Sequence, residues 1–111
     1  MLPAANRLRT AADFQTTTRR GLKASRGSVV VYLDRRSSGE TPRVGVIVSK
    51  SVGGSVQRHR AARRIRAAVR PWLAAVPTGS VVVVRALPGA DTTASLAGDV
   101  ASSLRAVLAR A

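Results

Sequence analysis

Residues 56–70 carry the pattern that most restricts how this chain can fold, because their side chains separate onto two opposite sides of a helix. At about 100° per residue, the apolar side chains share one arc and the arginines occupy the opposite one. A helix of this kind must bury one side against another layer of structure, and Pro71 should end or kink it. The apolar arc holds Ala61, Ala62, Ile65, Ala68, Val69, Trp72 and Leu73, and the basic arc holds Arg60, Arg63, Arg64, Arg66 and Arg70.

The basic arc has no compensating acid, since no Asp or Glu occurs between Pro42 and Pro71. A solvated surface helix ordinarily mixes its charges, because like charges three or four residues apart repel by roughly a few tenths of a kcal/mol. The whole chain has 19 Lys and Arg against 5 Asp and Glu, a formal charge of +14 over 111 residues. Such a field requires a polyanionic partner, which is nucleic acid or, as the alternative, an anionic membrane surface.

The predominance of arginine on this helix narrows the choice of partner. A guanidinium can hold a phosphate through two parallel hydrogen bonds and can also stack on a base. A folded RNA exposes both groups, so the pattern favours RNA binding over a merely solvated helix face. Arg58 differs from the other arginines because it falls beside the apolar arc near the helix start. We expect it to point along a sheet edge together with His59 and Lys50.

Two further helices are predicted, one near each end of the chain. Thr10 and Asp13 resemble a capping box, with a hydroxyl first and an acid three residues later, which predicts a helix over residues 11–19. Gly21 should end that helix. From Thr93 onward, apolar residues recur at helical spacing, which predicts a C-terminal amphipathic helix that covers a sheet.

Three segments have the composition of strands. The β-branched runs of residues 28–33 and 42–49 predict an antiparallel hairpin, joined through the polar residues 34–41. The four valines of residues 81–84, set between turn residues, predict a buried strand. The order helix, strand, strand, helix, strand, helix indicates an α+β fold, a two-layer sandwich of one small sheet packed with helices. At this length the chain forms a single domain, residues 1–111.

The sequence lacks the residue patterns of several common kinds of binding and catalytic site. Gly53 and Gly54 do not form a P-loop, because no Gly-Lys-Ser or Gly-Lys-Thr follows them. They predict instead a turn before the basic helix, and Ser55 is the predicted N-cap of that helix. Without cysteine there is no disulfide or thiolate zinc site. The five acids are dispersed, and no Ser, Cys or acid pattern accompanies His59. We therefore expect no catalytic residue and no metal site in this chain.

The sequence also bears on where the protein works. No apolar run approaches the length of about 18 residues typical of a membrane span, and the first residues lack the apolar core of a signal peptide. The expectation is a protein of the cytoplasm.

The turn and the basic helix together are similar to a family signature. The segment Ser-Lys-Ser-Val-Gly-Gly-Ser-Val-Gln-Arg-His-Arg-Ala-Ala-Arg-Arg-Ile-Arg, residues 49–66, resembles that of the bacterial ribonuclease P protein subunit. The family segment typically reads Ser-Lys-Lys-Val-Gly-Asn-Ala-Val-x-Arg-Asn-Arg-x-Lys-Arg-x-x-Arg. The matching residues are Lys50, Val52, Gly53, Val56, Arg58, Arg60, Arg63 and Arg66, and weaker matches elsewhere are Arg7-Leu8, Asp13-Phe14, Gly21, the strand at residues 30–32 and Arg43-Val44-Gly45.

The resemblance implies a protein cofactor of a ribonucleoprotein endonuclease that removes the 5′ leader from precursor tRNA. In that family the RNA subunit performs the cleavage and holds the magnesium ions, and the protein itself binds no cofactor. The partners implied are the ribonuclease P RNA and precursor tRNA, with neither DNA nor a membrane, and the protein is expected to be monomeric before it assembles with RNA. The fold implied is an α/β sandwich with a left-handed strand-helix-strand crossover and one more strand than the pattern reveals.

The resemblance also assigns roles to individual residues. Departures from the family pattern are Thr18 in place of a second aromatic residue, His59 in place of asparagine and Ala62 in place of lysine. The catalytic RNA would be bound by Lys50, Arg60, Arg63, Arg64, Arg66 and Arg70, and a cleft for the single-stranded leader would use Phe14, Tyr32, Arg58, His59 and Arg66.

Alternatives stay open for the aromatic residues and for the function. Trp72 is expected in the core, and the residues alone favour a core role and a base-stacking role equally for Phe14 and Tyr32. A purely structural RNA binder, such as a ribosomal protein or an RNA chaperone, would have the same composition. Only the signature of residues 49–66 favours the endonuclease subunit.

Overall fold

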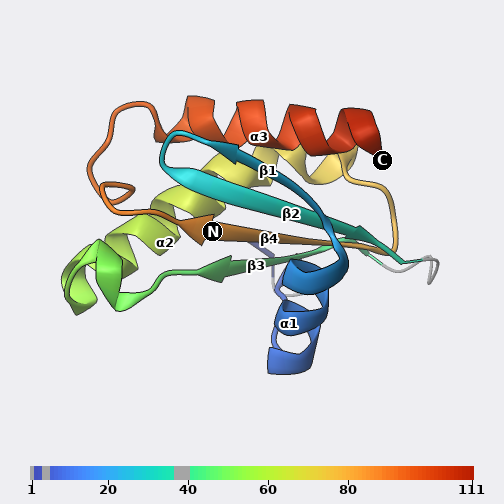
Figure 1. Ribbon diagram of the computed structural model, residues 1–111, viewed down its shortest axis with the longest axis horizontal. Coiled ribbons are helices and arrows are strands. Elements are labelled where there is room, and N and C mark those ends of the chain that lie inside the picture. Colours follow the sequence, from blue (N-terminus) through green and yellow to red (C-terminus); the bar gives the residue numbers. More distant parts are fainter. Residues whose placement is uncertain (1, 4–5, 37–40) are drawn as a thin grey trace.

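The structure is a computed structural model that describes residues 2–3, 6–36 and 41–111, and it contains a four-stranded mixed sheet with helices on both faces (Figure 1). The strands lie in the order β1-β2-β4-β3. Two 3₁₀ turns flank the second helix. In chain order the elements are α1 (Ala11–Arg20), β1 (Leu22–Arg26), β2 (Val29–Arg35), β3 (Arg43–Ile47), η2 (Lys50–Val52), α2 (Ser55–Val69), η3 (Arg70–Ala75), β4 (Ser80–Ala86) and α3 (Leu96–Arg110).

The predicted α+β fold is confirmed, but the predicted hairpin between residues 28–33 and 42–49 is wrong. β4 lies between those two strands, antiparallel to β2 and parallel to β3. The reason is burial: the valines of β4 alternate between two covered faces, so this strand is most stable in the interior of the sheet, with a partner on each side. Hydrophobic pattern alone does not show which strands are neighbours.

The connection from β3 through α2 to β4 is a left-handed crossover. Both strands point the same way in Figure 1, and α2 passes behind them as the chain moves from the outer strand β3 to the inner strand β4. This hand is opposite to the general rule for parallel strands. It agrees with what the family resemblance implies.

The strand that the sequence pattern did not reveal is β1. Only Ala24 is buried among its residues, and lysine, serine and arginine are weak strand formers. β1 pairs antiparallel with β2 through a tight turn at Gly27, whose φ of 55° suits glycine. The extra strand implied by the resemblance is thus confirmed.

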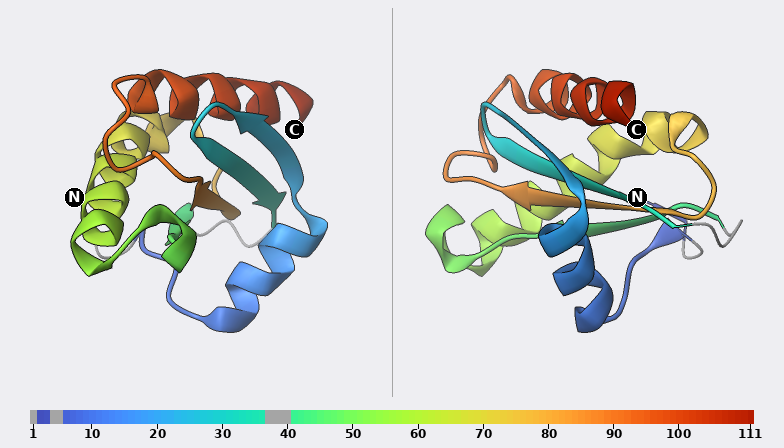
Figure 2. Two further views of the ribbon diagram at one scale, coloured as in Figure 1. Left: turned by 60° about the vertical axis from the view of Figure 1, so that its left-hand side comes forward. Right: turned by 45° about the vertical axis from the view of Figure 1, so that its right-hand side comes forward.

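Alternation along the strands divides the core in two. On one face, β2 and β4 pack under α2 and α3 in a large cluster that includes Val31, Val82, Ile65 and Leu104. On the other face, α1 covers part of the sheet over a smaller cluster. Figure 2 shows the sheet between these two layers. Within the described part of the chain, no helix is both long enough and apolar enough to cross a membrane.

Helix ends follow local chemistry. The predicted helix start is confirmed, since Thr10 is the N-cap and its hydroxyl accepts from the Asp13 N–H at 3.3 Å, and the helix stops at Gly21. The Asp13 carboxylate accepts from the Thr10 hydroxyl at 2.6 Å, so one of the two bonds of a capping box is replaced by a bond between side chains. The predicted N-cap of the basic helix is one residue off, because Gly54 occupies that position and Ser55 begins α2. The C-terminal helix begins at Leu96, three residues later than its apolar spacing predicted.

Candidate RNA interface

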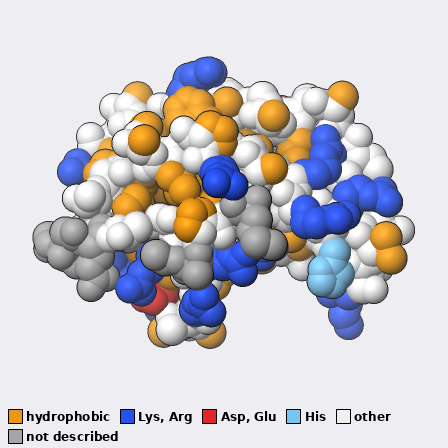
Figure 3. All heavy atoms as spheres, turned by 180° about the vertical axis from the view of Figure 1, so that it is seen from behind, with side chains coloured by type: hydrophobic (Ala, Val, Ile, Leu, Met, Phe, Trp, Pro, Cys, Tyr) orange, Lys and Arg blue, Asp and Glu red, His pale blue; other side chains and the backbone are white. Residues whose placement is uncertain are grey.

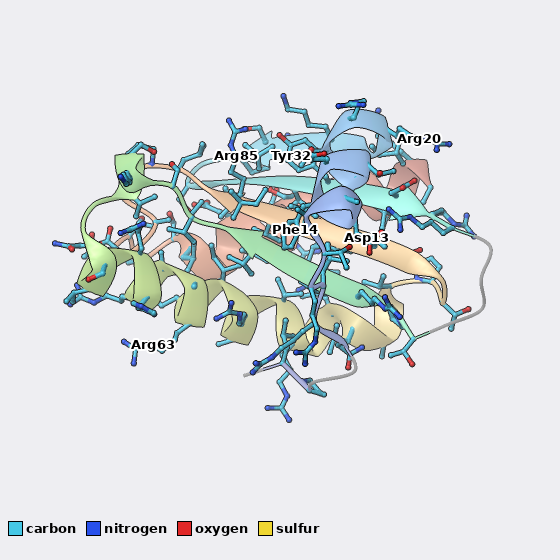
Figure 4. All side chains as sticks on the ribbon, turned by 90° about the horizontal axis from the view of Figure 1, so that it is seen from below. Asp13, Phe14, Arg20, Tyr32, Arg63 and Arg85 are labelled. Atoms are coloured by element: carbon cyan, nitrogen blue, oxygen red, sulfur yellow. The ribbon has the colours of Figure 1, made fainter. Side chains whose placement is uncertain are left out.

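Helix α2 has the two-sided character that its sequence predicts. Ala61, Ile65 and Val69 are fully buried against the sheet and α3, while Arg60 and Arg63 are exposed on the opposite side. Seen from behind in Figure 3, Lys and Arg side chains gather on one side of the molecule around its single histidine. Arg63 points away from the body of the protein in Figure 4. The outer side of α2 is therefore a cationic surface open to solvent.

One side of α2, from Ser55 to Arg66, and the end of β3 line a groove of about 390 Å³. It brings together Arg58, His59 and Arg66, three of the residues that the family resemblance assigns to the leader cleft. Val46 and Val48 contribute an apolar wall, and Ala62 of α2 also lines the groove. A groove with three basic side chains and an apolar wall can accept both the phosphate and the base of a nucleotide.

Arg58 has a buried donor without a partner. Its Nε has almost no solvent contact, and no acceptor lies within hydrogen-bonding distance among the described residues. An unsatisfied buried donor costs about 1–3 kcal/mol, so it favours the arrival of an acceptor. A phosphate oxygen in the groove would supply one.

The N-terminus of α2 adds to the positive potential near this groove. Gly54 has no side chain to cap the helix, and the first turn contains no acid. The free N–H groups of the first turn therefore keep their partial positive charge. Lys50, predicted to bind the catalytic RNA, lies exposed in the preceding turn η2.

Arg64 is placed differently from the exposed arginines of α2. Its guanidinium is half-buried and donates to the carbonyl oxygens of Ala90 at 3.1 Å and Thr93 at 2.5 Å. These bonds tie α2 to the loop that joins β4 to α3. The helical wheel put Arg64 among the outward arginines because it takes no account of the loop that crosses there. Its RNA contact stays a prediction, whereas its bond to the loop is a structural role.

The remaining predicted residues lie at other places. Arg70 is exposed at the start of η3, beyond the last turn of α2. Trp72 is half-buried against the main core, as expected, and the Arg105 guanidinium lies 5.4 Å from its ring centre.

Phe14 and Tyr32 lie together on the face of the sheet that carries α1 (Figure 4). Phe14 is half-buried over Gly45 of β3, where a Cβ atom would overlap its ring. Tyr32 is only 5% exposed, so little of its ring is free to stack. Because Gly45 faces α1 while Val46 faces the groove, the two predicted halves of the leader site lie on opposite faces of β3.

A network of charged groups fixes α1, and with it Phe14. Asp13 forms an ion pair with Arg36 at 2.8 Å, and Arg36 also reaches Asp34 at 3.2 Å. The hydroxyl of Thr10, followed by the Arg36 guanidinium, lowers the pKa of Asp13 below its ordinary value. These two carboxylates are occupied in structural contacts. Within the described residues, no group of three or more His, Asp or Glu side chains is arranged to hold a metal ion.

Sequence reasoning missed two cations beside Tyr32. The Lys23 ammonium lies 6.0 Å from the ring centre of Tyr32, and Arg85 is exposed next to this ring in Figure 4. The sequence does contain a signal for Arg85. It comes two residues after Val83, and side chains two residues apart point to the same face of a strand, so Arg85 should share a face with that valine. Lys23 gave no such signal, since β1 itself was not recognised.

The sequence is similar to a known protein family along nearly its whole length. The family described as Ribonuclease P matches residues 2–111 of this chain. The ribonuclease P protein component of Streptomyces griseus is 49% identical over 118 residues, which covers 97% of this chain and 96% of that protein. The corresponding protein of Beutenbergia cavernae is 45% identical over 113 residues, covering 100% of this chain and 95% of that protein.

Solved structures agree with the sequence relatives. The RNase P protein of Staphylococcus aureus superimposes with a TM-score of 0.76 at 26% identity, covering 96% of this chain and 94% of that chain. The RNase P protein of Thermotoga maritima, at 22% identity, shares the fold with a TM-score of 0.66 over 95% of this chain and 96% of that one. The family match over nearly the whole chain and these full-length relatives lead to one conclusion: this chain belongs to the ribonuclease P protein family.

Proposed function

We propose that this chain acts as the protein subunit of a bacterial ribonuclease P, and that it does so in the cytoplasm. It binds the catalytic RNA and the single-stranded 5′ leader of precursor tRNA, and so assists the magnesium-dependent cleavage that gives the mature 5′ end. The observation that carries the proposal is the basic side of α2 beside a groove where Arg58, His59 and Arg66 converge. Family membership supplies the reaction.

In this proposal the chain positions RNA and takes no chemical step of its own. The exposed arginines Arg60 and Arg63 bind phosphates of the catalytic RNA. Magnesium ions supply Lewis-acid chemistry from sites held mainly by that RNA. Three of the four described carboxylates are engaged in structural contacts, Asp13 and Asp34 with Arg36 and Asp99 with Ser28. This suits a chain that leaves metal binding to its partner.

The direct test is cleavage of precursor tRNA by a bacterial ribonuclease P RNA at low magnesium, with and without this protein. We expect a large stimulation, because bound cations lower the repulsion between the two RNAs. A purely structural RNA binder would bind the RNA without raising the cleavage rate. That outcome would remove the proposed function.

A further inference from the structure

The inner strand β4 presents one charged side chain on the sheet face that carries α1. Val81 and Val83 point to this face and are buried, and Arg85, the next residue in the alternation, is exposed. α1 covers only part of the face, and Figure 4 shows Arg85 beside that helix. Charged side chains on an edge strand can prevent that strand from pairing with another chain, but Arg85 lies on an inner strand, where this role is not needed. Its position suggests a ligand.

The neighbours of Arg85 give it no counter-charge. Across the sheet it pairs with Val30 of β2 and Ile47 of β3, and Ser25 of β1 pairs with that same valine. Within the described residues, the side chain of Arg85 makes no hydrogen bond or ion pair. Its guanidinium therefore keeps all of its donors for an external acceptor.

A second cation lies one row along the same face. Lys23 pairs with Tyr32 across β1 and β2, and its ammonium lies over the ring. The nearest acids on this face, Asp13 and Asp34, lie toward the opposite end of the strands and are both bound to Arg36. This part of the sheet therefore has two cations, an apolar floor and no available carboxylate among the described residues.

We propose that Arg85 and Lys23 bind backbone phosphates of the single-stranded leader, extending its path from Phe14 across the sheet toward β1. This inference rests on the proposed function, and charge complementarity selects the occupant. From Phe14 over β3 to Lys23 on β1 the path crosses three strand spacings, about 14 Å. Bases would face the apolar floor, and phosphates would face the two cations.

The test uses the holoenzyme, assembled from this protein and a bacterial ribonuclease P RNA. Arg85→Gln and Lys23→Gln are compared with Arg35→Gln, an exposed arginine at the end of β2 that points to the other face. Each variant is tested for binding of precursor tRNA with a long leader, precursor with a one-nucleotide leader, and mature tRNA. Unfolding temperatures check that Arg85→Gln, which breaks no hydrogen bond or ion pair, leaves the fold intact.

We expect Arg85→Gln to weaken binding of the long-leader precursor about two- to fivefold and to reduce its salt slope by about 0.7. Binding of mature tRNA should not change, and Lys23→Gln should act in the same direction. Equal loss for all three substrates, or the same effect from Arg35→Gln, would overturn the inference. So would a loss of affinity for the catalytic RNA, which would identify that RNA as the occupant. Stimulation of cleavage by the unaltered protein is measured in parallel and reports separately on the proposed function.

Discussion

Arg63 and Arg64 are adjacent in the sequence, but the structure gives them different surroundings. Arg63 projects into solvent, whereas the Arg64 guanidinium is bound to two carbonyl oxygens of the loop between β4 and α3. We predict that Arg63→Ala weakens binding to the catalytic RNA and leaves the unfolding temperature unchanged. Arg64→Ala should instead lower the free energy of unfolding by about 1–3 kcal/mol, because two carbonyls lose a charged donor. Urea unfolding and RNA titration of both variants distinguish these effects, and equal stability of the two would contradict the structural role of Arg64.

Phe14 rests on a residue with no side chain, and this fit suggests a second pair of variants. Phe14→Leu keeps an apolar contact with Gly45 but removes the aromatic plane. Since stacking contributes about 1–3 kcal/mol per base, we expect weaker binding of precursor tRNA and unchanged binding of mature tRNA. Gly45→Ala should lower stability by about 1–3 kcal/mol, because its methyl group would overlap the ring. If Phe14→Leu affected both RNAs equally, Phe14 would have only a core role.

At the scale of elements, Asp99 joins α3 to the turn between β1 and β2. Its carboxylate accepts from the Ser28 N–H at 2.9 Å, the Ser28 hydroxyl at 2.7 Å and the Ser95 hydroxyl at 3.1 Å. These bonds, those from Ser28 first, lower its pKa below the ordinary value of 3.8. The stabilisation is therefore fully present above that value and is lost as the pH falls through the folded-state pKa.

This linkage predicts a pH-dependent effect of Asp99→Asn. At pH 7 the variant should be less stable than the unaltered protein by about 1 kcal/mol, a modest figure because the carboxylate is partly exposed. The difference should shrink as the pH falls below about 4, where the aspartate becomes protonated. Urea unfolding at several pH values measures it. A difference that stayed constant with pH would show that charge is not the cause.

Sequence patterns predicted some of these elements and not others. Helical periodicity identified the buried side of α2, because all residues of that arc except Ala62 pack against one continuous sheet and helix layer. It could not identify β1, whose short and polar strand exists because β2 and the turn at Gly27 hold it in register. Nor could it place β4 between β2 and β3, since strand neighbours depend on contacts between distant residues. In the candidate site, the family resemblance grouped Arg58, His59 and Arg66, which the structure brings into one groove, and it did not include Arg85.

At the scale of the whole molecule, the sheet separates two cationic surfaces. Arg60 and Arg63 lie on the outer side of α2, and Arg85 and Lys23 lie on the opposite face of the sheet beside α1. Because these pairs do not touch each other, substitutions in one should have effects on free energy that add to those in the other. The two surfaces can therefore be tested as independent binding sites for two RNAs.

We predict that the double substitution Arg60→Gln and Arg63→Gln weakens binding of the catalytic RNA and reduces its salt slope by about 0.7–0.9 for each phosphate that the protein no longer binds. It should leave the preference of the assembled holoenzyme for long-leader precursor over mature tRNA unchanged, since neither Arg60 nor Arg63 is among the residues assigned to the leader. Adding Arg85→Gln should then lower the preference by the same factor as Arg85→Gln alone, with the free energies additive to within about 0.5 kcal/mol. Titrations of both RNAs over a range of salt concentrations measure these quantities. Strong non-additivity would contradict independent binding at the two surfaces, as when one RNA contacts both of them.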